Sequence, residues 1–440
     1  MSMLFVLRTF VNCGVLCLWL VSLPVFSQGL GTLIELAKQN DPQWILGNAK
    51  FRESKELLPQ AYSQLLPSIY FTNNSNKVQQ QLTNATTQGP EQNYPSSSRG
   101  ITLRQPIFKT KQILGVNLAS AQTEQALFNF KEESQQVTLR VVDAYINLML
   151  ATDRKFFLNS QVELINLRLK AAIAGLRAGQ GVRIDVDEAQ AELSKLKADE
   201  IQINQSITIA KLQLEMLTGI SNLDISVLNK DKILIFTQSI PTSDLLFDQA
   251  KVNNPKFLGQ KLDIEIAEFL LKQAASGHHP SLELIAQATL TTGESSYFVS
   301  TRNNNRLIGI QLNVPLYSGG VVNSQIRQAI AKLEQAQAQL SISHNNLKMQ
   351  IHKESNALRE GNKRIEAFKE AINSARQVVI SSQKGILAGT RTELDVIKNQ
   401  YQLAQVEFDL SRSYYDLFGA YIRLHWNLGL LNEETVALLN

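Results

Sequence analysis

The chain has two cysteines in 440 residues, and both, Cys13 and Cys17, lie near its beginning. The remainder therefore has no thiol for a disulfide or for a metal site. The formal net charge is only +4 and no long basic block is present, which argues against nucleic-acid binding. After residue 27 no run reaches the ~18 continuous apolar residues of a membrane helix, so this part could enter a membrane only as strands.

The first residues have the pattern of an export signal. Arg8 is the only early charge, an apolar run from Val11 to Leu23 follows, and Val25-Phe26-Ser27 suits cleavage. We predict that residues 1–27 are a signal peptide. Neither cysteine follows the small residues that a lipoprotein signal needs, so we expect no lipidation.

One sequence pattern occurs twice, about 210 residues apart. The matching positions are Gly175 with Gly385, Gly179 with Gly389, Asp185 with Asp395, and Gly219 with Gly429. A period this long exceeds that of a solenoid unit and predicts two fused, structurally equivalent halves. We place these repeats at 28–219 and 244–429, with a linker at 220–243 and a terminal segment at 430–440.

Each half is expected to contain a helix broken at proline, two strands, one very long helix, a glycine tip and a return helix. Asp41 and Asn254 are predicted N-caps, because proline follows each at the first helical position. Heptad spacing marks the long helix of the second half, through Leu333, Leu340, Leu347, Ile351, Leu358, Ile365, Ile372 and Val379. At 1.5 Å per residue its ~65 residues form a rod of about 100 Å, too long for a globular domain.

The return helices carry matching apolar seams. In the first half the seam is Ala189, Leu193, Leu196, Ile203, Ile207, Ala210, Leu214 and Leu217, and in the second it is Asn399, Leu403, Val406, Ser413, Leu417, Ala420, Leu424 and Asn427. Each half is therefore predicted to be an antiparallel helical hairpin, turning at about 177–183 and at about 387–392. Small residues beside the seams suit a ring of helices better than an isolated pair.

Four segments alternate apolar and polar residues, at about 66–80, 97–108, 281–292 and 305–316. Alternation of this length is typical of transmembrane barrel strands. The intervening segments Gln81–Ser98 and Thr291–Asn305 are rich in Asn, Thr, Ser and Gly, and we expect them to be exposed loops. Four strands cannot close around a lumen, so strands must be shared between protomers.

Several motifs occur in the order found in one known family. They are Leu66-Pro67-Ser68, Gln105-Pro-Ile-Phe108, the run from Val314 to Ala329, the run from Ala388 to Val396, and Leu428-Gly-Leu-Leu-Asn432. On these residues the chain resembles the TolC family of outer-membrane efflux and export proteins, over essentially the whole mature sequence.

This resemblance implies a mostly α fold with a membrane β part: a trimer whose twelve-stranded β-barrel is continued by a twelve-helix α-barrel. It further implies a passive exit duct in the outer membrane of a Gram-negative bacterium, serving a tripartite efflux pump or a type I secretion system. The expected partners are the other protomers of a homotrimer, outer-membrane lipid, a periplasmic adaptor protein and an inner-membrane transporter of the RND, ABC or MFS type. Residues 220–243 and 430–440 would lie in the equatorial belt around the helices.

The resemblance also implies a gate at the periplasmic entrance. Asp395 matches a ring aspartate, Arg391 a gating arginine, and Asp185 an aspartate that holds the helices together. The chain departs from the family at Lys398, which replaces a second ring aspartate, and at Ile386 and Ile184, which replace a tyrosine and a threonine. Gly179, Gly389 and Thr390 would contact the adaptor.

Simpler structural roles compete with these assignments. Asp185 and Asp395 could merely favour a helix N-terminus, and both tip glycines could merely supply the positive φ that ends a helix. Thr392 and Asp395 fit a capping box, whereas Val182 at the equivalent site cannot cap. We therefore expect the two tips to differ in stability.

No catalytic constellation is recognisable, and neither a cofactor nor a metal site is expected. The histidine pairs His278-His279 and His344 with His352 lack a nearby third ligand, which favours solvated or interfacial histidines. Two other classes of protein remain possible: a periplasmic adaptor, which would carry one hairpin instead of two, and a secreted coiled-coil protein, which would lack the strands.

Overall fold

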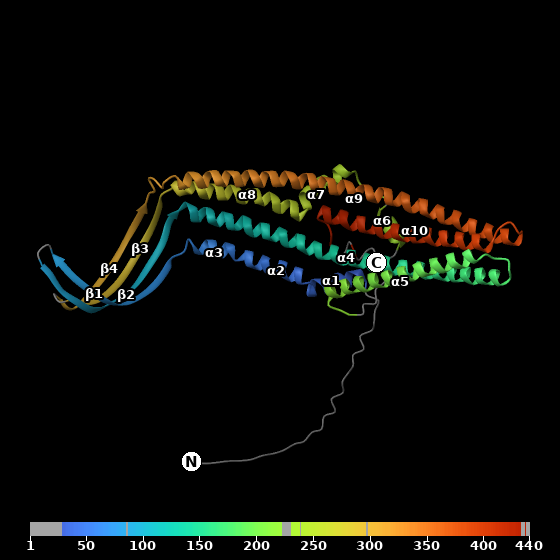
Figure 1. The fold of residues 1–440 in the computed structure, drawn as a ribbon. Coiled ribbons are helices and arrows are strands. Elements are labelled where there is room, and N and C mark those ends of the chain that lie inside the picture. Colours follow the sequence, from blue (N-terminus) through green and yellow to red (C-terminus); the bar gives the residue numbers. More distant parts are fainter. Residues whose placement is uncertain are drawn as a thin grey trace, which may run out of the picture.

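A computed structural model describes residues 29–84, 87–221, 230–237, 239–295, 298–432 and 436. The molecule is elongated, with a curved four-stranded sheet at one end and long helices running away from it (Figure 1). Both helical hairpins turn at the end opposite the sheet. The predicted signal peptide lies outside the described residues, as do residues 222–229 and 238 of the linker and most of the terminal segment.

The sheet is antiparallel in the order β1-β2-β3-β4. Its strands are β1 (Ser68–Asn84), β2 (Thr87–Lys109), β3 (Ser281–Ser295) and β4 (Phe298–Asn313). Pairing of β2 with β3 joins strands that are far apart in sequence, and within the described chain the outer edges of β1 and β4 have no partner strand.

The strands extend further than the sequence suggested. Most of the segments predicted as loops, Gln81–Ser98 and Thr291–Asn305, are strand, and β4 ends at Asn313 instead of near residue 316. The polar composition of these segments indicated exposure to water, but a polar strand can still pair through its backbone. Solvent exposure was therefore mistaken for loop structure.

The helices follow the predicted order in both halves. Before and along the first hairpin lie α1 (Leu30–Asn40), α2 (Pro42–Lys55), α3 (Leu57–Ser63), α4 (Thr110–Arg177) and α5 (Arg183–Thr218). The remaining helices are α6 (Lys230–Thr237), α7 (Ser243–Asn253), α8 (Pro255–Ala275), the 3-10 turn η1 (Ser276–His278), α9 (Val321–Leu387) and α10 (Glu393–Leu428).

Both predicted helix breaks are confirmed. Asp41 accepts a hydrogen bond from the backbone N–H of Gln43 at 2.9 Å, and Asn254 accepts one from Phe257 at 2.9 Å. A side-chain amide near each break also binds the last turn of the return helix: Asn40 donates to the Thr218 carbonyl at 2.7 Å, and Asn254 donates to the Asn427 carbonyl at 2.8 Å. Each return helix is thereby fixed to the broken helix of its own half.

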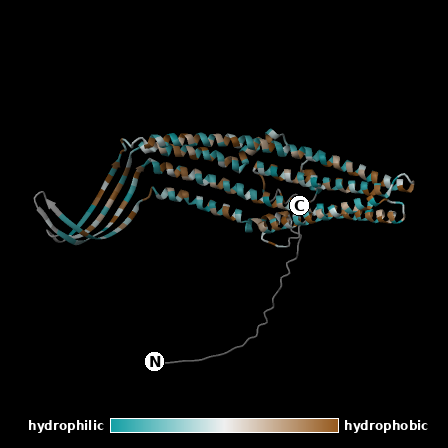
Figure 2. Cartoon of the chain, in the orientation of Figure 1, coloured by the Kyte–Doolittle hydropathy of each residue, from teal (hydrophilic) through white to brown (hydrophobic). Residues whose placement is uncertain are grey.

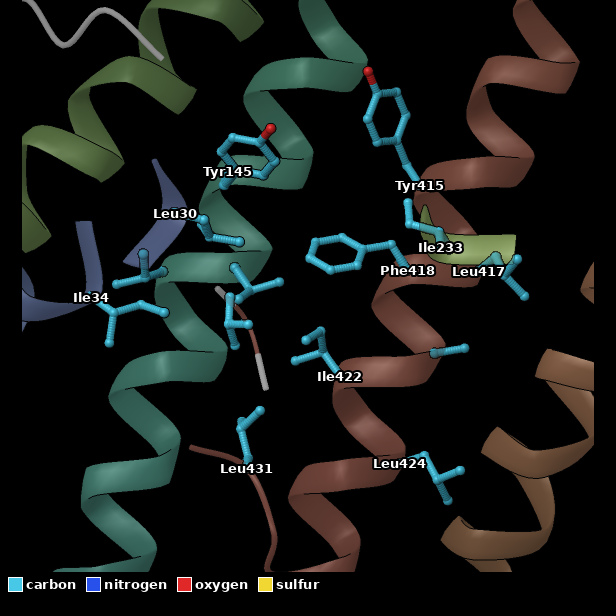
Figure 3. Close-up of a cluster of buried hydrophobic side chains, with 14 of the residues drawn as sticks. Leu30, Ile34, Tyr145, Ile233, Tyr415, Leu417, Phe418, Ile422, Leu424 and Leu431 are labelled. Carbon is cyan, nitrogen blue, oxygen red and sulfur yellow. The ribbon is translucent and has the colours of Figure 1, made fainter. Parts of the chain in front are cut away.

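The predicted seams are largely confirmed by burial. Leu347, Ile351, Leu358, Ile365, Ile372 and Val379 are buried on α9, and Ala189, Leu193, Leu196, Ile203, Ala210 and Leu214 are buried on α5. The largest core lies midway along the helices, where α1, α4, α6 and α10 meet (Figure 3). Leu30 and Ile34 from α1 and Tyr145 from α4 belong to this core, and Phe418 and Ile422 extend from α10 toward α4. No described helix has both the length and the hydropathy needed to cross a membrane.

Candidate functional site

The two hairpin tips have the same backbone path. Each long helix ends at a glycine in the left-handed region, with φ of 73° at Gly179 and 70° at Gly389. A Cβ atom added to either glycine would meet nothing within 4 Å. The requirement for glycine at both tips is therefore conformational and not steric.

Both tips are also closed by the same hydrogen bonds. The backbone N–H groups of Gln180 and Gly181 donate to the Gly175 carbonyl at 2.9 and 3.0 Å. At the second tip, Thr390 and Arg391 donate to the Gly385 carbonyl at 2.9 and 3.2 Å. The Thr390 hydroxyl donates to this carbonyl as well, at 3.2 Å.

The tips differ at the position that follows this closure. At the first tip a Cβ on Gly181 would lie 2.9 Å from the backbone nitrogen of Leu176, so a side chain there would require the turn to shift. The equivalent residue of the second tip is Arg391, whose stem packs on Gly385; a Cβ on Gly385 would lie 2.7 Å from Arg391 Cγ. Gly385 therefore makes room for a cationic side chain at the second tip.

The predicted capping box at the start of α10 is confirmed. The Thr392 backbone N–H and hydroxyl each donate to Asp395 Oδ2 at 3.0 Å, and the Asp395 N–H donates to Thr392 Oγ1 at 3.2 Å. The N–H of Thr392, then its hydroxyl, lower the pKa of Asp395, and the nearby cations Arg391 and Lys398 lower it further. Val182 makes no such side-chain cap at the first tip.

One chain alone does not assemble the gate that the resemblance implies. Asp185 is half-buried in the first turn of α5, and Lys398 is exposed one turn along α10 from Asp395. Across the described part of the chain, neither Asp185 nor Lys398 forms a hydrogen bond or an ion pair with Arg391 or Asp395 through its side chain. Asp185, Arg391, Asp395 and Lys398 therefore remain predicted gate residues.

No local sequence pattern predicts the polar contacts that Arg423 makes with two other helices. Arg423 on α10 lies 3.4 Å from Glu354 on α9 and 3.9 Å from Asp143 on α4. Glu354 is only 2% exposed, so its carboxylate depends on this cation. Burial raises the pKa of Asp143, and the charge of Arg423 opposes that rise.

A second polar cluster links α4, α6 and α10. Asp153 accepts hydrogen bonds from the hydroxyls of Ser411 and Tyr415, the latter at 3.0 Å. Lys230 donates to Ser411 at 3.1 Å and lies 4.0 Å from the Asp153 carboxylate. Burial, and then the Asp153 charge, raise the pKa of Tyr145 to about 12. Since these partners are up to 262 residues apart in sequence, no local pattern could have revealed them.

Metal-binding geometry is not found among the described residues, where no three His, Cys, Asp or Glu side chains form a cluster suited to an ion. His344 instead packs edge-on against the ring of Phe247, with 4.9 Å between ring centroids. His278 lies 3.2 Å from Asn323.

One face of the sheet carries a continuous apolar surface. Residues that pair across antiparallel strands share a face, and one row of paired residues consists of Ile69, Leu103, Ala286 and Ile308. With the neighbouring rows this apolar face comprises Ile69, Phe71, Ile101, Leu103, Leu284, Ala286, Ile308 and Ile310, of which Ile308 is 78% exposed. Figure 2 shows that the hydrophobic residues of the strands gather in the half of the sheet nearer the helices. So large an exposed apolar surface indicates contact with lipid or with another protein.

Comparison with known proteins gives consistent matches. The family model described as "Outer membrane efflux protein" matches residues 33–220 and 246–430. The chain is 25% identical to the proteases secretion protein PrtF of Dickeya chrysanthemi, over 94% of this chain and 90% of that protein. It is 26% identical to the alkaline protease secretion protein AprF of Pseudomonas aeruginosa (94% and 87%) and 25% identical to the outer membrane protein TolC of Vibrio cholerae (96% and 95%).

Solved structures share the fold. The outer membrane protein VceC of Vibrio cholerae superposes with a TM-score of 0.76 at 18% identity, over 91% of this chain and 96% of that one. The CmeC outer membrane channel of Campylobacter jejuni also gives a TM-score of 0.76, at 14% identity, over 92% and 88%.

Proposed function

Because the chain belongs to the outer membrane efflux protein family, we propose that it is the exit duct of a tripartite efflux pump or a type I secretion system. The protein lies in the outer membrane of a Gram-negative bacterium, like the relatives it matches. One observation carries the proposal: a sheet with an exposed apolar face leads into helices of 68 and 67 residues, directly from β2 into α4 and through residues 314–320 from β4 into α9. This shape fits a membrane-spanning part joined to a long tunnel.

The duct requires three copies of the chain. Backbone groups on the outer edges of β1 and β4 would be unsatisfied in lipid, at several kcal/mol for each group. Three protomers that pair β1 of one with β4 of the next remove both edges and form a twelve-stranded barrel, within which the lumen is continuous.

The helices support the same assembly. Since α4 packs against both α5 and α10, and α10 against α9, the row of helices in one protomer ends in α5 on one side and α9 on the other. The free side of α5 exposes apolar residues, with Ile201 at 72% and Met216 at 69%, and α9 exposes Met349 at 58%. Closure into a twelve-helix barrel would bury these side chains between protomers.

The hairpin tips form the periplasmic entrance of this duct. Threefold symmetry would bring three copies of Asp395 and Arg391 near one axis, with Asp185 and Lys398 beside them. Gly179, Gly389 and Thr390 would lie at the outermost turn, where a periplasmic adaptor protein linked to an inner-membrane transporter can reach them. Since PrtF and AprF are named for protease secretion, a polypeptide is the first cargo to test.

Reconstitution of the mature chain in planar bilayers tests the proposal. Purified protein should run as a heat-sensitive trimer and should conduct ions as a trimer. A conducting monomer would contradict strand sharing. Recovery of the chain in soluble periplasmic or inner-membrane fractions would instead favour an adaptor.

A further inference from the structure

Basic residues gather at one end of the apolar face of the sheet. Arg306 pairs with Ala288, which pairs with Ile101, so Arg306 lies on the apolar face. Arg99 pairs with Leu290 in the next row, farther from the helices, and shares the same face. Both arginines therefore lie where the apolar rows end.

Two further cations continue this arrangement. Arg302 pairs with Thr292, which pairs with Ser97, two residues along β2 from Arg99. Lys77 lies opposite Pro95 in the row beyond. We call Lys77, Arg99, Arg302 and Arg306 the basic rim. All four side chains are exposed, and to other described residues they make neither a side-chain hydrogen bond nor an ion pair.

The basic rim is confined to one face and one end of the sheet. Near the helices the same face carries Leu282, Leu284, Ile310 and Leu312 and no charged residue. The cations at that end, Arg104 and Lys109, lie on the opposite face, where Lys109 forms an ion pair with Glu283.

The opposite face at the level of the basic rim is uncharged. Its paired residues there are Asn74, Ser98, Thr291 and Asn303. Farther from the helices, Glu91 lies on the same face as the basic rim, opposite Gln81. It is the acidic residue of that face among the side chains that the structure describes. Charge placed only for solubility would have no reason to favour one face, so the pattern indicates an anionic ligand outside the barrel.

We propose that the basic rim binds the phosphate groups of a phosphorylated glycolipid in the outer leaflet of the outer membrane. The proposal rests on the proposed barrel, in which the apolar face contacts lipid and the strand ends far from the helices face the cell exterior. The rim then lies at the level of the outer headgroups. Arginine forms paired hydrogen bonds with phosphate oxygens, and an anionic leaflet attracts basic residues at its surface.

The spacing of the arginines suits a headgroup with more than one phosphate. From standard strand spacings, the α-carbons of Arg99 and Arg306 lie about 12 Å apart, and those of Arg99 and Arg302 are separated by about the same distance. Two such long side chains can converge on one phosphate or span two phosphates of one lipid. Three protomers would repeat the rim around the barrel.

Lipid binding by the full mature trimer in detergent tests the proposal. The probe is bisphosphorylated lipid A, compared with dephosphorylated lipid A and with phosphatidylglycerol. Each arginine near an anionic headgroup should raise the affinity for lipid A about fivefold. Changing Arg99, Arg302 and Arg306 together to Gln should therefore lower this affinity on the order of 100-fold. The corresponding triple change to Lys should keep most of the affinity, because it keeps the charge.

A matched pair of single variants lies on one strand. Arg99→Gln should lower affinity for lipid A about fivefold, whereas Arg104→Gln, on the opposite face of β2, should leave it unchanged. Three results would each overturn the proposal. The triple Gln variant could bind lipid A as tightly as wild type does, or the two single variants could lose the same affinity. Wild type could also bind dephosphorylated lipid A or phosphatidylglycerol as tightly as it binds bisphosphorylated lipid A.

Conductance separates this proposal from the proposed function. If wild type forms no channel in a bilayer, the duct itself is refuted, and the basic rim with it. If wild type and the triple Gln variant conduct equally and also bind lipid A equally, the duct stands and the glycolipid site is refuted.

Discussion

Replacement of Arg423 by Gln should destabilise the protein, because it leaves a buried carboxylate without its cation. Glu354 is 2% exposed and has Arg423 as its closest cation, at 3.4 Å; Lys353 is at 3.8 Å and largely exposed. Removing one partner of a buried pair costs about 3–5 kcal/mol. Arg423 itself is 39% exposed, so solvent screening reduces the expected loss to about 2 kcal/mol per protomer.

The effect should depend on pH through Asp143. Its pKa is already raised by burial, and loss of the Arg423 charge should raise it further. A carboxyl with a raised folded-state pKa opposes folding once it ionises. The free energy of unfolding that the Arg423→Gln variant loses relative to wild type should therefore grow as pH rises from about 4 through that pKa. The difference should shrink in acid.

The stability lost by the Arg423→Gln variant can be measured by urea unfolding of the trimer in detergent, followed by circular dichroism. The matched control is Arg412→Gln, which breaks an exposed pair with Asp416 on the same helix and should change stability by less than about 0.5 kcal/mol. Adding Glu354→Gln to Arg423→Gln should recover more than half of the loss. If the Arg423 and Arg412 variants are equally stable, or if the double variant recovers none of the lost stability, the contact between Arg423 on α10 and Glu354 on α9 is not a buried ion pair in energetic terms.

Other predictions concern the tips. Gly389→Val should abolish export in a secretion assay while the trimer still assembles, since a β-branched residue resists a φ of 70°. The control is Gly293→Val, which should export normally in the same assay, because Gly293 lies in open space at an ordinary φ. Lys398→Asp should strengthen channel block by a trivalent cation and Asp395→Ala should nearly remove it; unchanged block in both would leave Asp395 with only its role in the cap. Because its folded-state pKa is lowered, Asp395 should stay charged as pH falls, so block should persist to about pH 4 in conductance titrations, and loss of block already near pH 6 would contradict this.

Local chemistry explains which features could be predicted. The breaks at Asp41 and Asn254, the capping box at Thr392 and the seam through Ile351 and Leu358 each depend on residues within a few turns of one another, and all were predicted from sequence. Strand length was missed because polar residues pair through their backbone as readily as apolar ones.

Contacts between distant segments were missed for a different reason. Arg423 and Glu354 are 69 residues apart, and Tyr415 and Asp153 are 262 apart. Neither periodicity nor spacing relates such positions. The gate residues form a third case, because the proposed contacts of Asp185, Arg391 and Asp395 require neighbouring protomers.

The two tips share a backbone but not a chemistry, and this difference bears on how the proposed entrance would open. The first tip has glycine at 181 and no side-chain cap at Val182, so its turn carries no charge between Ala178 and Val182. The second tip holds Arg391 against Gly385 and ties Asp395 to Thr392. Since the capping bonds fix the Asp395 carboxylate to its own helix, separation of protomers would move this charge with α10 as a unit. Opening would then change the distances between like charges without breaking the cap, and repulsion among the three carboxylates would favour the open state. Neutralising Asp395 while keeping its hydrogen bonds, as in Asp395→Asn, should therefore lower the fraction of channels that are open in conductance recordings, whereas Asp185→Asn on the uncapped first tip should change that fraction less.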